Sequence, residues 1–149
     1  MTLGKDLMVF VNGKSVAFAT SHTFNWEPTF NETSTLTKDT VGNATKQLMT
    51  AYSWTLSTDN LMAWTGDTSN TDTPAGNTFK DILQLGIAGT EVTLVFALGS
   101  AFSTTSGWSP AGTTLTGKGF VGSTSVTADV GDNASFSITF QGTGDITVV

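Results

Sequence analysis

Apolar and polar residues alternate with a period of two in most apolar segments of this sequence, and this is the side-chain period of a β-strand. In residues 52–57 the aromatic and aliphatic side chains occupy even positions and Ser and Thr occupy odd positions, and residues 135–141 repeat the pattern. Such a strand has one apolar face that packs in a core and one hydroxyl face that can contact water. The chain is therefore predicted to fold mainly as antiparallel β-strands.

A β-hairpin is predicted near the start of the chain. Two apolar runs, residues 7–11 and 15–19, flank the pair Asn12-Gly13, and an Asn-Gly pair between such runs is a strong hairpin signal. Pro28 has no N–H to donate to a neighbouring strand, so the strand expected over residues 23–30 belongs at a sheet edge or strand end. Further strands are expected over residues 92–98 and 115–130.

One helix is predicted, over about residues 78–87, with Asn77 or Thr78 as its N-cap. Its apolar stripe consists of Phe79, Ile82, Leu83 and Gly86. About seven or eight strands and one helix, without strand-helix alternation, predict a mostly β fold, an antiparallel β-sandwich or barrel with one flanking α-helix. A length of 149 residues fits a single domain over residues 1–149.

The composition argues against several classes of function. Six Lys, no Arg and twelve Asp plus Glu give a formal net charge of −6, which disfavours a basic nucleic-acid-binding patch. With no Cys and a single His, the chain can form no disulfide, thiol nucleophile or multi-His zinc site. No apolar run approaches the roughly 18 residues of a membrane span, so membrane insertion is not expected.

Two polar segments are predicted to be functional loops. Residues 31–47 contain almost no apolar side chain, and a loop of this length in a compact domain is usually functional or disordered. Residues 99–114 hold Phe102 and Trp108 among Ser, Thr, Gly and Pro. Large apolar groups in such a loop often contact a partner, and these two are candidate subunit contacts.

Three motifs resemble ligand sites but fit a structural role better. Residues 112–119 nearly match a phosphate-binding P-loop and residues 117–122 match a dinucleotide fingerprint, yet no helix follows to face a phosphate. A β-strand relieved by glycines is the preferred interpretation. Asp67, Ser69, Asn70 and Asp72 have side-chain oxygens that suggest a calcium loop, but they lack its ligand spacing. An acidic turn is therefore expected.

Catalysis has little support in the sequence. His22 is the single possible imidazole base, and no nucleophile elbow accompanies it. Neither a cofactor nor a metal ion is expected, and the chain is predicted not to be an enzyme. A sugar-stacking platform is an alternative because carbohydrate-binding β-sandwiches use exposed aromatic side chains. The aromatic residues considered are Trp26, Tyr52, Trp54, Trp64 and Trp108.

Four segments in a fixed order carry a resemblance to a known family. They are the opening hairpin with the following Ala-Thr-Ser-His-Thr, the triplet Thr37-Lys38-Asp39 with Gly42, the Ser-Trp-Thr-Leu-Ser-Thr-Asp of residues 53–59, and residues 134–144. Together, over most of the chain, they resemble the major tail tube protein of long-tailed bacteriophages. The chain departs from that pattern after Gly42, where Asn43 replaces a frequent aromatic residue.

The resemblance implies a structural subunit without catalysis. Hexameric rings of such subunits stack into a hollow tube that conducts DNA into the host during ejection. A tape-measure protein occupies the lumen beforehand, and tail terminator and tail-tip proteins are further expected partners. The expected location is the virion tail, assembled in the cytoplasm of the bacterial host. Alternatives are a carbohydrate-binding or adhesin module, and the tube protein of a contractile injection or secretion apparatus.

Three sets of residues are expected to serve assembly. The inter-ring contact is placed in the loop of residues 31–47, at Thr37, Lys38, Asp39, Gly42 and Lys46. The subunit contact is placed at Phe102 and Trp108. The lumen is expected to be lined by hydroxyl faces of strands, at Ser53, Thr55, Ser57, Ser135, Ser137 and Thr139. An acidic wall without Arg would repel DNA phosphates instead of holding them.

Overall fold

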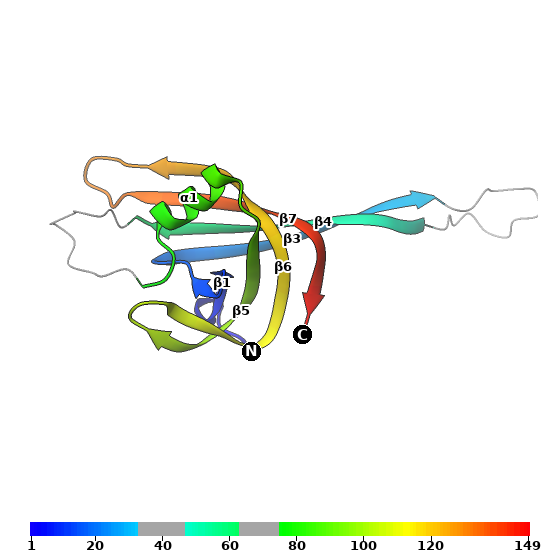
Figure 1. Ribbon diagram of the computed structural model, residues 1–149, viewed down its shortest axis with the longest axis horizontal. Coiled ribbons are helices and arrows are strands. Elements are labelled where there is room, and N and C mark those ends of the chain that lie inside the picture. The colour runs from blue at the N-terminus through cyan, green and yellow to red at the C-terminus, as the bar shows by residue number, and fades with distance from the viewer. Residues whose placement is uncertain (33–46, 63–74) are drawn as a thin grey trace, which may run out of the picture.

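The computed structural model describes residues 1–32, 47–62 and 75–149. In these residues seven strands form one antiparallel sheet in the order β2-β1-β5-β6-β7-β4-β3, with a single α-helix against it (Figure 1). The elements are η1 (Gly4–Asp6), β1 (Leu7–Val11), β2 (Lys14–Ser15), β3 (Ala19–Glu32), β4 (Gln47–Leu61), α1 (Phe79–Ala88), β5 (Val92–Ser103), β6 (Gly107–Thr127) and β7 (Ser135–Val148). The mostly β fold with one flanking helix is confirmed.

The predicted opening hairpin is present, with a shorter second strand than expected. Asn12 and Gly13 both have positive φ, 51° and 83°, as a type I′ turn requires. The second strand, expected over residues 15–19, ends at Ser15. The chain then turns through Phe18, which also has a positive φ of 53°, and starts β3.

The sheet curls strongly. β2 and β3 form its two opposite edges, yet only residues 16–18 separate them in the chain. Four Cα steps span about 15 Å at most, whereas a flat sheet of seven strands would be about 29 Å wide. The edges must therefore approach each other, and the N–H of Leu61 in β4 donates to the carbonyl oxygen of Phe18 at 3.0 Å.

The core lies inside this curl and is closed by α1. The even-numbered residues of β4 and β7 point inward, as the alternation predicted, and the fully buried side chains include Trp54, Leu56, Ile138 and Phe140. α1 packs on β6 and contributes Phe79 and Ile82 to the core. The ring of Phe79 lies 5.1 Å from that of Phe136, between ring centres.

The helix begins where the sequence predicts. Thr78 is the N-cap, and the carboxylate of Asp81 accepts hydrogen bonds from its backbone N–H and its hydroxyl, both at 3.0 Å. The side chain of Asn77 donates to the carbonyl oxygens of Val11 and Lys14, each at 2.9 Å. These bonds attach the start of the helix to the opening hairpin.

The prediction of a loop over residues 99–114 was wrong. β5 and β6 run through most of this segment and pair up to Ser103 and Gly107. Irregular pairing between Phe96 and Leu98, and again between Gly99 and Phe102, interrupts the period of two. Phe96 packs against the core, and Ala97 on the other side of the strand is also buried.

The glycine-rich motifs lie in β6 and serve packing. A side chain at Gly117 or Gly142 would collide with the indole ring of Trp54. Gly117 therefore allows close approach of a large core side chain. The interpretation of this segment as a β-strand relieved by glycines is confirmed.

A two-stranded ribbon extends beyond the body of the sheet (Figure 1). β7 pairs with β4 over Thr55 to Leu61, whereas β3 and β4 stay paired out to Glu32 and Gln47. We call residues 29–32 and 47–51 the arm. The loop predicted over residues 31–47 is thus shorter than expected, and residues 33–46 lie outside the described residues. Pro28 lies in β3, which is an edge strand as predicted.

Candidate assembly surfaces

One face of the sheet, opposite the core and α1, carries the hydroxyl groups predicted to line a lumen. Ser57 pairs with Thr139 across β4 and β7, Asp59 pairs with Ser137, and Leu61 pairs with Ser135. Directly paired residues of antiparallel strands point to the same side. The candidate positions on β4 and β7 therefore share one face, which we call the hydroxyl face. Its members are Ser53, Thr55, Ser57, Ser135, Ser137 and Thr139.

Asp59 lies on the same face, between the Ser57–Thr139 and Leu61–Ser135 pairs, and was not among the predicted positions. Its carboxylate accepts hydrogen bonds from the hydroxyls of Ser21 at 2.9 Å and Ser137 at 2.6 Å. These bonds lower the pKa of Asp59, because they stabilise the charged form. Asp59 occupies the next odd position after Ser57, so its side of the strand could be read from the alternation. Its partners, 38 and 78 residues away, could not.

The arm exposes a set of large apolar side chains. Phe30, Leu48 and Met49 are 52%, 58% and 46% exposed. At its base, Trp26 is 48% exposed and lies 6.0 Å from the ring of Tyr52. A two-stranded ribbon is at best marginally stable in water, and exposed apolar clusters of this kind mark interaction sites. The arm is therefore a candidate contact surface.

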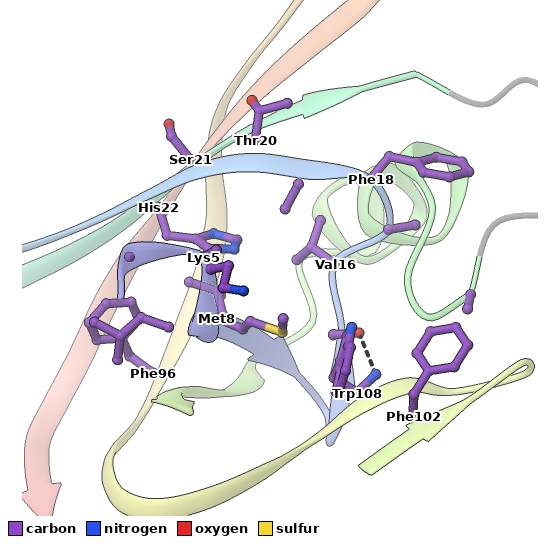
Figure 2. A pocket seen from close by; sticks show the side chains of 17 residues that line it. Lys5, Met8, Val16, Phe18, Thr20, Ser21, His22, Phe96, Phe102 and Trp108 are labelled. Carbon is purple, nitrogen blue, oxygen red and sulfur yellow. Dashed lines mark hydrogen bonds between the residues drawn. The ribbon is translucent and has the colours of Figure 1, made fainter. Parts of the chain in front are cut away.

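A pocket of about 410 Å³ lies between the N-terminal segment, β1, the start of β3 and the hairpin of β5 and β6 (Figure 2). Its walls are mostly apolar and aromatic. Phe102 and Trp108 are paired on the hairpin with 5.4 Å between ring centres, and remain 57% and 37% exposed. The backbone N–H of Trp108 donates to the hydroxyl of Ser15 at 3.0 Å, which attaches the hairpin to β2. The labelled lining side chains are Lys5, Met8, Val16, Phe18, Thr20, Ser21, His22, Phe96, Phe102 and Trp108.

His22 lines the same pocket. Its Nδ1 atom is buried and has no hydrogen-bond partner among the described residues. Burial lowers the pKa of His22 below its usual 6.5, and the nearby charge of Asp59 offsets part of this effect. Neutral His22 is therefore favoured in the folded chain.

The remaining sequence candidates divide between buried positions and undescribed ones. Trp54 is buried in the core, as predicted from its strand face. Thr37, Lys38, Asp39, Gly42 and Lys46 lie outside the described residues, as do Trp64, Asp67, Ser69, Asn70 and Asp72.

The described part of the chain holds neither a metal-binding cluster nor a membrane-spanning helix. No group of three or more His, Cys, Asp or Glu side chains lies close enough there to hold a metal ion. The described helix is also too short to cross a bilayer.

Comparison with known proteins identifies the fold. No protein-family model matches the chain, and no curated protein matches it. Two solved structures of a gene transfer agent, the tail of an empty particle with C6 symmetry and the virion of the native particle, match all of this chain and 99% of theirs. Their TM-scores are 0.71 and 0.68, and their sequence identities 11% and 13%. The chain has a tail tube fold.

A third structure, the SPP1 tail tube, extends this likeness. It matches 99% of this chain and 78% of its own, with a TM-score of 0.62 and 12% identity. The fold implied by the resemblance in sequence is thus confirmed over the whole chain. At 11–13% identity the fold is retained while almost all side chains differ.

Proposed function

We propose that this chain is the structural subunit of a tail tube, in which hexameric rings stack into a hollow conduit for DNA. The observation that carries the proposal is the match of the entire chain to a chain in a tail with C6 symmetry, at a TM-score of 0.71. A likeness over the full length accounts for every described strand and the helix. The role is structural, and no enzymatic activity is proposed.

The hydroxyl face is the proposed lumen wall. It lies opposite the face that α1 covers, so a tube with this face inward would place the helix outside. On this face Ser57 hydrogen-bonds to Thr139, and Asp59 accepts hydrogen bonds from Ser137 and from the neighbouring Ser21. Lys118 on β6 has a carboxylate partner, Glu91, at 3.8 Å. A wall with no Arg in a chain of net charge −6 offers DNA phosphates little attraction.

The arm and the segment between its strands are the proposed inter-ring contact. That segment contains Thr37, Lys38, Asp39, Gly42 and Lys46. Each contact of this kind is weak, but a sixfold ring repeats it and avidity multiplies the effect. The subunit contact is proposed at Phe102 and Trp108.

The proposed location is the tail of a phage or phage-like virion, with assembly in the cytoplasm of the bacterial host. A tape-measure protein would occupy the lumen before DNA, and terminator and tip proteins would cover the two ends. Passage of DNA through such a lumen requires no specific DNA-binding pocket in the subunit.

Electron microscopy of the purified full-length chain tests the proposal. Negative staining over a wide concentration range, with and without tail-tip initiator proteins, should show rings or tubes with a central channel. A chain that stays monomeric in sedimentation under every one of these conditions would contradict the proposed function.

Shortening the segment between the arm strands tests the inter-ring assignment. Replacing residues 35–44 with a short Gly-Ser turn should leave thermal unfolding of the free subunit nearly unchanged, because both arm strands and the core remain. Tube growth should be abolished. Normal polymerisation of this variant, or loss of its fold, would show that the segment has another role.

An alternative is a glycan-binding module, which the half-exposed Trp26 beside the partly buried ring of Tyr52 favours. Binding of the chain to a glycan array, abolished by Trp26→Ala, would support it over the tube proposal.

A further inference from the structure

The arm and the pocket lie toward opposite ends of the molecule. In Figure 1 the arm projects to one side of the sheet, whereas β1 and the hairpin of β5 and β6, which line the pocket, lie toward the other. A rigid arm cannot reach the pocket of its own chain. A contact between them would join two copies through different patches, and such a contact repeats from head to tail.

The two surfaces match in apolar character. On one face of the arm Phe30 pairs with Met49, and Leu48 lies on the other face; each of the three is about half exposed. The pocket presents Met8, Phe18, Phe96, Phe102 and Trp108 around an open volume of about 410 Å³. Burial of one apolar surface against the other removes both from water, which is the main favourable contribution to association.

The charges on the two surfaces are opposite. None of the residues that line the pocket is Asp or Glu, and the charged side chain among them is Lys5. Among the described residues of the arm and its base, the charged side chains are Glu27 and Glu32, with no Lys. The arm therefore carries acidic and apolar side chains, and the pocket of a second copy offers a basic and apolar surface. Complementary charges attract the two surfaces and also fix their orientation.

We propose that the arm of one subunit docks in the pocket of the next copy, with Phe30 and its apolar neighbours against Phe102 and Trp108, and Glu32 toward Lys5. This rests on the proposed tube function and names the acceptor surface for the arm. The same contact gives the paired aromatic side chains on the β5–β6 hairpin a partner.

Charge reversal in the full-length chain tests the pairing. Lys5→Glu and Glu32→Lys should each raise the critical concentration for tube formation, followed by light scattering, by roughly two- to fivefold, the range expected for an exposed ion pair. The double variant should return toward the wild-type value. Lys80→Glu on the exposed surface of α1 is the matched control and should leave it unchanged.

Apolar substitution and cross-linking test the contact directly. Phe30→Ser and Phe102→Ser should each raise the critical concentration by about tenfold or more, as loss of a buried aromatic contact does, whereas the exposed Ile87→Ser on α1 should not. Since the chain has no Cys, the Phe30→Cys and Phe102→Cys variants can be purified separately and then mixed. A disulfide-linked dimer should then form only in the mixture and only after assembly.

The outcomes separate the two proposals. Wild-type chains that never assemble overturn the tube function and this contact with it. If the wild type forms tubes, three results would each overturn the contact alone. They are unchanged assembly of Phe30→Ser and Phe102→Ser, no rescue in the double charge reversal, and no cross-link. Equal melting temperatures of the unassembled variants establish that a loss of assembly is not a loss of fold.

Discussion

Trp54 is the largest fully buried side chain, and its position depends on residues that have no side chain. Gly117 and Gly142 border the indole ring, and its Nε1–H donates to the carbonyl oxygen of Gly144 at 3.2 Å. The alternation in residues 52–57 predicted that Trp54 faces the core. It could not predict the glycines, because strands β6 and β7 approach the ring only in the folded sheet.

Gly142→Ala is expected to destabilise the chain by about 1–3 kcal/mol, because the added methyl group overpacks the site around Trp54. Chemical denaturation of the unassembled subunit measures the change. Gly4→Ala is the matched control, since a methyl group there meets nothing within 4 Å. Equal stability of the two variants would contradict the packing described for Trp54.

His22 gives the folded chain a dependence on pH. Because its pKa is lowered in the folded state, the unfolded chain binds a proton more readily as pH falls below about 6.5, and the free energy of unfolding falls with it. His22→Gln removes this linkage. The melting temperature of the variant should change less between about pH 7.5 and 5 than that of the wild type, and an unchanged slope would rule out His22 as its source.

Asp59 titrates in a separate range. Its lowered pKa contributes stability that is present above its usual value of 3.8 and is lost as pH falls through the lower folded value. The two groups can therefore be distinguished in one pH series.

At the scale of elements, the sequence predicted those whose local pattern is uninterrupted. The inward residues of β4 and β7, the turn at Asn12-Gly13 and the start of α1 all follow from short-range signals. The second strand of the opening hairpin was predicted to be too long, because the turn through Phe18 forms only where the chain joins the two edges of the curled sheet. The segment 99–114 was misread because irregular pairing removes the alternation on which strand prediction depends.

The cap of α1 is a testable element-scale feature. Asp81→Ala removes the carboxylate that accepts two hydrogen bonds from Thr78, and should lower the free energy of unfolding by about 1 kcal/mol. Lys80→Ala, at the adjacent exposed position, should change it little. A loss in the control as large as in Asp81→Ala would indicate that the capping bonds do not stabilise the helix.

At the scale of the whole molecule, the candidate surfaces differ in how far they could be predicted. The six hydroxyl positions were predicted because each belongs to a clear alternation. The arm and the pocket were missed. The arm depends on where β7 stops pairing with β4, and the pocket is built from segments spread between residues 4 and 108. The sequence does not encode either feature locally.

The lumen assignment predicts which residues a tube hides. In free subunits, a bulky polymer-linked maleimide should react with both Ser53→Cys on the hydroxyl face and Lys80→Cys on α1. In tubes, the Ser53→Cys variant should react much more slowly with this reagent, while a small maleimide that enters the channel still labels it. Equal rates for the two variants in tubes would place the hydroxyl face outside the lumen.

The strand order also determines when the sheet of a newly made chain becomes complete. β1 pairs with β5 and β4 pairs with β7, so β1 has an unpaired edge until β5 is made, and β4 has one until β7 is made. Long-range pairing of this kind folds slowly compared with local contacts. A chain in which β7 has not yet been made therefore lacks a continuous sheet between β6 and β4, although every residue that lines the pocket precedes β7.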